Sequence, residues 1–286
     1  MPQVEVNQKG YLLLMQAKGA AAALPLAQTQ SNREHANRWD RLENGYPWAL
    51  VLHWFGDDPH SELKLASYLN GFDGLRRISG YETRTSAHAL VGRAHPAEAG
   101  EQIGIVQTQH PFPDGTPLVA SHLPMLDYQS HIERRQYFVR ALYELNQREA
   151  TVHSVLQDWF DGAWLDPNLR SLGLELCGRD FDTPANAPPD QQVANVVGVV
   201  AALMRRYAIP ASNLLGHLEI QTNKPDPGKK FMALVRCLLG GLALTGGDSQ
   251  LMQLVFGQYL LDDGDPWRAV RTYFQFGRDY LLLTGR

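Results

Sequence analysis

Short apolar runs and amphipathic segments alternate along much of the chain. Residues 48–55 (WALVLHWF) form a nearly continuous apolar run behind a glycine and a proline, which predicts a buried strand. Residues 172–176 (LGLEL) alternate instead, with leucines on one face of the predicted strand and Gly173 and Glu175 on the other. Further short strands are predicted at residues 86–91, 103–106, 137–145 and 213–217.

Helical periodicity is strongest in the second half of the chain. Apolar residues recur at steps of three and four over residues 190–207, which predicts a helix that Pro210 ends. Residues 61–70 show the same spacing and stop at Gly71. More helices are predicted at 231–239, 249–261 and 266–283, with a break at Gly240 and Gly241. Because helices alternate with strands, we expect an α/β fold with a central mixed β-sheet flanked by helices.

The pattern also divides the chain into one predicted domain with additions. From residue 92 to about residue 136 the periodicity gives way to Pro, Gly, Gln and His, which indicates a long, lid-like insertion. We predict an N-terminal extension at 1–45, a domain at 46–240 that contains this insertion, and a helical C-terminal extension at 241–286.

The N-terminal segment contains apolar stretches at 11–15 and 20–27 that are similar to the centre of a secretory signal. Gln16 and Lys18 interrupt them, and Glu5 stands where such a signal carries positive charge. We therefore expect this segment to form a strand or helix that packs on the domain. A cytoplasmic location is favoured over secretion on the same grounds.

Composition excludes several classes of protein. The chain has 286 residues, of which 44% are hydrophobic and 20% charged, so it can bury a sizeable core. A net charge of -4 argues against a nucleic-acid partner, because such proteins concentrate Lys and Arg on one face. Cys177 and Cys237 lack the spacing of a thiolate zinc site. No run reaches the roughly 18 apolar residues that a membrane span needs.

The segment 217–231 (HLEIQTNKPDPGKKF) carries the most informative polar pattern. Asp226 lies nine residues after His217 in a Pro-Asp-Pro-Gly turn, where the prolines restrict the position of its carboxylate. A catalytic zinc ion takes three protein ligands, such as imidazole nitrogens and carboxylate oxygens, and keeps a fourth position for water. His53, near the end of another predicted strand, is the best third candidate. On spacing alone, a helix-capping aspartate and a surface histidine explain the same pattern.

Residues 48–231 resemble the zinc-dependent N-acetylmuramoyl-L-alanine amidases, a fold shared by phage amidase lysozymes, muropeptide amidases and peptidoglycan recognition proteins. The resemblance runs through six segments in the same order: WALVLHWF, SELKLASYLN, TSAHALVGR, REATVHS, SLGLELCG and GHLEIQTNKPDPGKKF. It implies an amidase-like α/β fold and hydrolysis of the amide bond between N-acetylmuramic acid and L-alanine. Peptidoglycan or its muropeptide fragments are the implied substrate.

The resemblance also implies a role for each matching residue. His53, His217 and Asp226 match the zinc ligands, so one Zn²⁺ per chain is expected. Glu175 matches the catalytic glutamate, which takes a proton from the attacking water molecule. Lys224 matches a lysine that points into the site, where a cation stabilises the developing oxyanion.

The other histidines are harder to assign. His88 in TSAHALVGR is interpreted first as a hydrogen-bonded structural residue, with substrate binding as the alternative. His153 matches a histidine that lines the substrate cleft and commonly follows a tryptophan, but Val152 precedes it here, which weakens the expected contact. Solvated or capping roles are expected for the histidines of the predicted insertion, which lack ligand spacing: His95, His110, His122 and His131.

Two alternatives to an amidase stay open at this point. Some proteins of this fold bind peptidoglycan without catalysis, although a pure binder has no need of the full set of zinc ligands and Glu175. A zinc hydrolase with a different amide substrate is the second alternative, because the long insertion can reshape the cleft.

Overall fold

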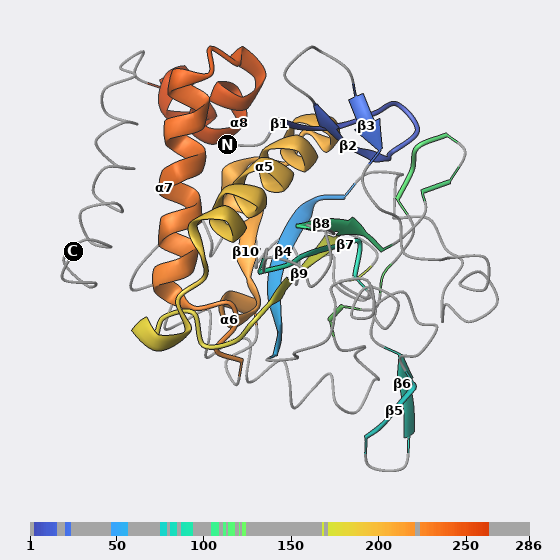
Figure 1. The fold of residues 1–286 in the computed structure, drawn as a ribbon. Coiled ribbons are helices and arrows are strands. Elements are labelled where there is room, and N and C mark those ends of the chain that lie inside the picture. Colours follow the sequence, from blue (N-terminus) through green and yellow to red (C-terminus); the bar gives the residue numbers. More distant parts are fainter. Residues whose placement is uncertain are drawn as a thin grey trace.

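A five-stranded β-sheet forms the centre of the computed structural model of the protein (Figure 1). In the order β10-β4-β9-β7-β8, the strands comprise Leu214–Gly216, Ala49–Gly56, Ser171–Cys177, Ala89–Val91 and Ile105–Gln107. The first four run parallel and β8 pairs antiparallel with β7, so the sheet is mixed, as predicted. The structure describes residues 3–15, 21–23, 47–56, 75–78, 81–84, 87–93, 104–108, 111–112, 114–117, 120, 122–123, 168, 171–220 and 224–262.

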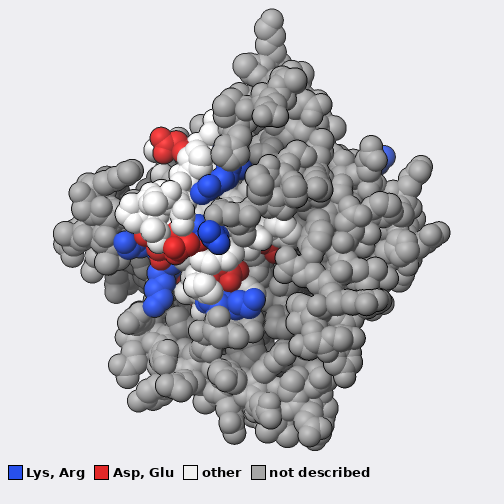
Figure 2. Space-filling view, turned by 60° about the horizontal axis from the view of Figure 1, so that its bottom comes forward, with Lys and Arg blue, Asp and Glu red and all other residues white. Residues whose placement is uncertain are grey.

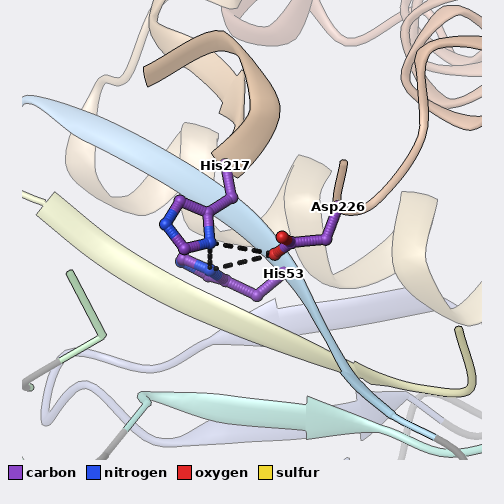
Figure 3. Close-up of side chains that lie close together, drawn as sticks. All are labelled: His53, His217 and Asp226. Carbon is purple, nitrogen blue, oxygen red and sulfur yellow. Dashed lines mark hydrogen bonds and ion pairs between the residues drawn. The ribbon is translucent and has the colours of Figure 1, made fainter. Parts of the chain in front are cut away.

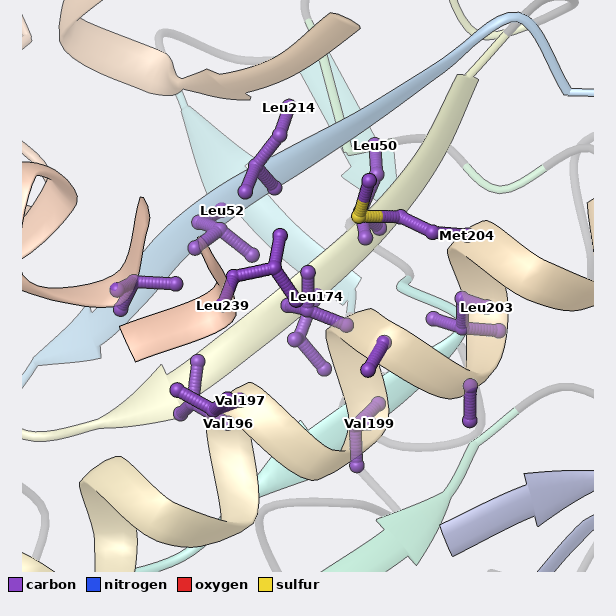
Figure 4. Close-up of a cluster of buried hydrophobic side chains, with 14 of the residues drawn as sticks. Leu50, Leu52, Leu174, Val196, Val197, Val199, Leu203, Met204, Leu214 and Leu239 are labelled. Atoms are coloured by element: carbon purple, nitrogen blue, oxygen red, sulfur yellow. The ribbon is translucent and has the colours of Figure 1, made fainter. Parts of the chain in front are cut away.

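Helix α5 (Asp190–Tyr207) packs on one face of this sheet and has the bounds predicted from its periodicity. Its residues Val196, Val197 and Met204 belong to the same buried apolar cluster as the leucines of β4 and β9 (Figure 4). Burial of each such side chain contributes about 1.5–3 kcal/mol of transfer free energy. The helix ends at Ala208, which adopts the left-handed conformation with φ 54°, and Pro210 follows.

In the described part of the chain, three further α-helices follow: α6 (His217–Ile220), α7 (Lys229–Thr245) and α8 (Ser249–Asp262). The predicted break at Gly240 and Gly241 is wrong, because α7 continues through both glycines. A glycine inside a helix costs up to about 1 kcal/mol relative to alanine. Burial of Leu239 and Ala243 on the same helix offsets that cost. Helix α7 therefore crosses residue 240, where the predicted domain ends.

Strand β9 is buried along its whole length. Leu172, Leu174 and Leu176 belong to the apolar core under α5, so the alternation of the strand places Gly173 and Glu175 on the opposite face. This confirms the two-faced strand that the LGLEL pattern predicts. The second face carries the polar groups described below.

The N-terminal segment forms a small antiparallel sheet of β1 (Gln3–Val6), β2 (Leu12–Met15) and β3 (Ala21–Ala23). Figure 1 shows this sheet beside the C-terminal end of α5, and Val4 is part of the central core. The side chain of Gln107 also accepts a hydrogen bond from the N–H of Leu12 and donates one to the carbonyl of Gly10. The predicted packing of this segment on the domain is confirmed for β1 and β2, whose residues Val4 and Leu12 lie in the central core.

The range predicted as an insertion contributes to the central sheet. Strand β8 lies within residues 92–136 and pairs with β7, and His122 from the same range is buried. The predicted strand at 213–217 is shorter, because His217 begins α6. A separate two-stranded sheet pairs β5 (Leu75–Ile78) with β6 (Tyr81–Arg84). Three predictions lie outside the described residues: the helix at 61–70, the strand at 137–145 and the helix at 266–283.

Charged side chains of both signs are interspersed over the described part of the face seen in Figure 2. Within the described ranges, no helix combines the length and apolar character that a membrane crossing requires.

Candidate active site

Three buried side chains meet near the carboxyl ends of β4 and β10 (Figure 3). His53 Nδ1 lies 3.0 Å from His217 Nδ1, which lies 2.9 Å from Asp226 Oδ2. The third separation, between His53 Nδ1 and Asp226 Oδ2, is 3.6 Å. These residues, hereafter the His-His-Asp triad, are only 2%, 6% and 4% exposed. The structure thus brings together the three residues predicted as zinc ligands.

The strand order explains why the two histidines meet. Strands β10 and β4 are parallel neighbours in which Gly216 is paired with Leu52, so His217 comes next to His53. In α/β sheets, ligands bind in the crevice outside the carboxyl ends of the strands. The His-His-Asp triad occupies that position.

A partly buried ion pair between Glu219 and Arg236 holds the turn that carries His217. Glu219 Oε2 accepts a hydrogen bond from the N–H of Gly216 at 2.7 Å. Arg236 on α7 donates to both carboxylate oxygens of Glu219 at 2.8 Å and to the carbonyl of Leu214 at 2.7 Å. Bidentate pairs of this kind are geometrically specific. The pair therefore ties α7 to the end of β10 and orients α6.

Asp226 reaches the histidines because its loop folds back on α6. The N–H of Leu218 donates to the carbonyl of Asp226 at 2.8 Å. Beyond this contact, Asp182 accepts hydrogen bonds from the first three N–H groups of α7 at 2.8–3.2 Å and caps the helix. Gly228 has φ 110°, and a Cβ there would lie 2.4 Å from Asp182 Oδ1, so only glycine allows this approach.

The protonation states of His53 and Asp226 suit metal binding. Burial lowers the pKa of His53 to about 4, although its hydrogen bond with Asp226 acts in the opposite direction. Burial alone would raise the pKa of Asp226, but the hydrogen bonds and charges of His217 and His53 outweigh it and hold that pKa below its ordinary value. His53 is therefore neutral and Asp226 ionised at neutral pH. These are the forms that bind a metal ion.

The geometry of the triad also suits zinc. In a tetrahedral site with bonds of about 2.0–2.2 Å, two ligand atoms lie about 3.3–3.6 Å apart. The observed separations of 2.9, 3.0 and 3.6 Å need only small shifts to reach that spacing. Among the described residues, the triad is the one group of three or more His, Cys, Asp or Glu placed to hold a metal ion.

The sequence matches the family model of the N-acetylmuramoyl-L-alanine amidases over residues 43–229. The chain belongs to the N-acetylmuramoyl-L-alanine amidase family. The matched range contains the whole His-His-Asp triad and Glu175. Membership supports an amidase activity on peptidoglycan.

Several solved structures are similar to this chain at low sequence identity. One is a crystal structure of a selenomethionine AmpD derivative, with 22% identity and a TM-score of 0.42, covering 74% of this chain and 93% of that chain. The endolysin amidase LysCS from Clostridium intestinale URNW has 14% identity and a TM-score of 0.35, covering 67% and 84%. The amidase LysC from the same organism has 14% identity and a TM-score of 0.36, covering 67% and 86%. No curated protein matches the chain in sequence.

Both predicted catalytic residues of this amidase lie near the triad. The register of β4 and β9 pairs Glu175 with His53, so the two side chains leave neighbouring strands on the same face of the sheet. Glu175 is only 5% exposed. Lys224 is exposed, and its charge is close enough to contribute to the lowered pKa of His53. The catalytic roles of Glu175 and Lys224 stay predictions.

The structure places one of the two histidines predicted to bind substrate. His88 is buried, and its Nδ1 accepts a hydrogen bond from the N–H of Gly173 at 2.9 Å. This contact agrees with the structural interpretation of His88, and its contact with substrate stays a prediction. His153 lies outside the described residues, as do His95, His110 and His131.

His122 is the residue that sequence reasoning missed in this amidase. The predicted solvated or capping role is wrong, because His122 is 6% exposed and its Nδ1 lies 3.1 Å from His53 Nε2. Burial and the charges of facing histidines hold its pKa well below the ordinary value. One feature of the sequence, Gly173, is consistent with the buried position of His122. A glycine inside a buried strand marks a close approach, and a Cβ on Gly173 would lie 2.5 Å from His122 Cγ.

Proposed function

We propose that this amidase is a zinc hydrolase that cleaves the amide bond between N-acetylmuramic acid and L-alanine in peptidoglycan or muropeptides. The His-His-Asp triad carries the proposal. Its two imidazole nitrogens and one carboxylate oxygen lie within 3.6 Å of one another in a chain of the amidase family. Three such ligands leave a fourth position for water. We propose one zinc ion per chain.

In this proposal His53, His217 and Asp226 would hold the zinc ion through the converging atoms Nδ1, Nδ1 and Oδ2. A bound zinc ion supplies a Lewis acid that lowers the pKa of a water molecule and polarises an amide carbonyl. In the metal-free protein, two sets of contacts keep the donor atoms close together. They are the Glu219–Arg236 ion pair and the cap that Asp182 places on α7. A site ordered in advance holds its ligands within the tolerance that catalysis requires.

Glu175 is the proposed general base and acid. The register that pairs it with His53 on the neighbouring strand supports this role, because both side chains leave the sheet on the same face. The carboxylate accepts a proton from that water and then donates it to the alanine nitrogen as the C–N bond breaks. Proton transfer by a positioned side chain typically accelerates a reaction by about 10²–10⁴-fold.

Lys224 is the proposed partner of the developing oxyanion. Lys224 lies two residues before Asp226, so the same loop carries both the carboxylate ligand and a cation. A positive charge stabilises the oxygen only as charge develops on it, so it lowers the barrier rather than tightening substrate binding.

Digestion of purified peptidoglycan and of a soluble muropeptide tests the proposal. The protein is assayed in three forms: loaded with zinc, treated with a chelator, and treated with a chelator before zinc is restored. Mass spectrometry should show release of stem peptides with a free L-alanine amino group, loss of this product with the chelator, and its return with zinc. Gln250→Ala, on the exposed side of α8, serves as a matched control that should behave as the wild type.

Three outcomes would contradict the proposal. Muropeptides that bind but stay intact would support a peptidoglycan-binding protein without catalysis. Cleavage at another amide would indicate a zinc hydrolase with a different substrate. Cleavage that survives complete metal removal would exclude zinc from the reaction.

A further inference from the structure

A chain of buried hydrogen bonds leads from the triad into the core of the domain. The nitrogen of His53 that faces away from the triad, Nε2, lies 3.1 Å from His122 Nδ1. On the far side of that ring, His122 Nε2 lies 3.0 Å from Ser171 Oγ and 3.4 Å from the Ser171 carbonyl. The two imidazole rings stand edge to face, with their planes at 78°.

The direction of this chain follows from the chemistry of imidazole. A neutral histidine carries one N–H, so a ring that binds a metal through Nδ1 must carry its proton on Nε2. His53 then donates from Nε2 to His122 Nδ1. His122 must in turn carry its own proton on Nε2, where the oxygens of Ser171 accept it. The N–H of each of the two rings then meets an acceptor.

Hydrogen bonds also hold the backbone at His122 in place. The N–H groups of His122 and Leu123 both donate to Asn168 Oδ1, at 3.1 and 2.8 Å, and Asn168 Nδ2 donates to the Leu123 carbonyl at 2.9 Å. On the strand side, the missing Cβ of Gly173 makes room for the ring. Because both its backbone and its ring are held in this way, we expect His122 to have a function beyond the filling of space.

We propose that His122 is a positioning residue for the metal centre: it accepts the Nε2 proton of His53 and thereby holds the Nδ1 lone pair of His53 on the metal. This inference rests on the proposed zinc function and deepens it. Metal-bound histidines generally donate their second N–H to a carboxylate, a carbonyl or water. Here another histidine takes that place, and it comes from the range that the sequence predicts as an insertion.

His122→Phe tests the role, because phenylalanine keeps a ring over Gly173 but offers no acceptor. Loss of such an outer partner typically weakens metal binding by about 10–100-fold. We expect His122→Phe to raise the Kd for Zn²⁺, measured by competition with a chromogenic chelator, by about that factor. His122→Asn should restore most of the affinity, because Asn Oδ1 lies near the position of His Nδ1. The absorption spectrum of the Co²⁺-substituted protein should change in His122→Phe and return toward the wild type in His122→Asn.

Leu172→Ala is the matched control for general damage to the core. It truncates a buried side chain on the same strand but on the opposite face. We expect it to lower the thermal unfolding temperature while the Kd for Zn²⁺ stays within about threefold of the wild type, since it contacts no donor atom. Zn²⁺ affinity of His122→Phe equal to that of the wild type would overturn the positioning role.

The wild-type protein provides a second test that does not depend on the folding of a variant. Nitrogen-15 NMR of the zinc-loaded protein should show His122 in the Nε2–H tautomer, with a scalar coupling between His53 Nε2 and His122 Nδ1. A proton on His122 Nδ1 would overturn the inference. Failure of the proposed function is distinguishable, because wild-type protein that binds no zinc contradicts the metal centre itself, whereas normal zinc binding in His122→Phe contradicts only the role of His122.

Discussion

The two faces of strand β9 are built from different kinds of contact. Toward α5 the strand presents Leu172, Leu174 and Leu176 to an apolar layer held by forces that have no preferred direction. Toward the other face it presents Gly173 and Glu175, and the polar groups there depend on hydrogen bonds of defined length and angle. Changes on the first face should therefore alter stability, and changes on the second should alter chemistry.

Glu175→Gln should give the largest effect. It tests the face of β9 that carries Gly173 and Glu175, hereafter the chemical face. Removal of the proposed proton acceptor should lower kcat for muropeptide hydrolysis by about 10²–10⁴-fold. The glutamine has nearly the same shape, so zinc content and thermal unfolding temperature should stay close to the wild type. Steady-state kinetics beside metal analysis separate the two effects. A kcat equal to that of the wild type would remove Glu175 from the mechanism.

Leu174→Ala tests the apolar face of the same strand. The leucine is fully buried under α5, so its truncation should lower the free energy of unfolding by about 2–5 kcal/mol. Urea denaturation measures the loss. The kcat of the folded, zinc-loaded fraction should not change, and Leu174→Met should cost less than about 1.5 kcal/mol. Loss of zinc from a Leu174→Ala protein that stays folded would show that the two faces are coupled.

Acid should destabilise the chemical face of the metal-free protein first. His53 has a pKa of 6.5 in the unfolded chain and about 4 in the folded one, so below pH 6.5 the unfolded state binds more protons. The free energy of unfolding should fall between pH 6.5 and 4, by roughly 3 kcal/mol from this group. The lowered pKa of Asp226 adds a loss in the same direction below pH 3.8.

Urea denaturation of metal-free protein at pH 7, 5.5 and 4 measures this dependence. His53→Asn removes the titrating ring and should give a shallower fall between pH 6.5 and 4 than the wild type. An equal slope in both proteins would contradict the assignment of the effect to His53.

Sequence patterns predicted the apolar face well because its determinants are local. The 190–207 periodicity gives α5 its bounds, and the LGLEL alternation gives β9 its two faces. The break predicted at Gly240 and Gly241 fails for the opposite reason. Helix propensity is a local property, but the burial of Leu239 depends on contacts with the rest of the core.

The chemical face was predictable only in part. The spacing of His217 and Asp226 left a capping aspartate as an alternative explanation. The strand-end position of His53 made it a candidate third ligand, and the family resemblance then supported all three. The structure adds the reason, since β4 and β10 are parallel neighbours although 164 residues separate the two histidines. His122 gave no signal in its own segment, because its side-chain partners His53 and Ser171 lie 69 and 49 residues away.

The zinc content of triad variants tests the central claim most directly. Wild-type protein, Asp226→Ala and Glu175→Gln are exposed to equal zinc, dialysed and weighed by native mass spectrometry. The wild type and Glu175→Gln should each carry one zinc ion per chain, and Asp226→Ala should carry far less under the same conditions. One zinc ion retained by Asp226→Ala as tightly as by the wild type, or none in the wild type, would contradict the His-His-Asp triad as the metal centre.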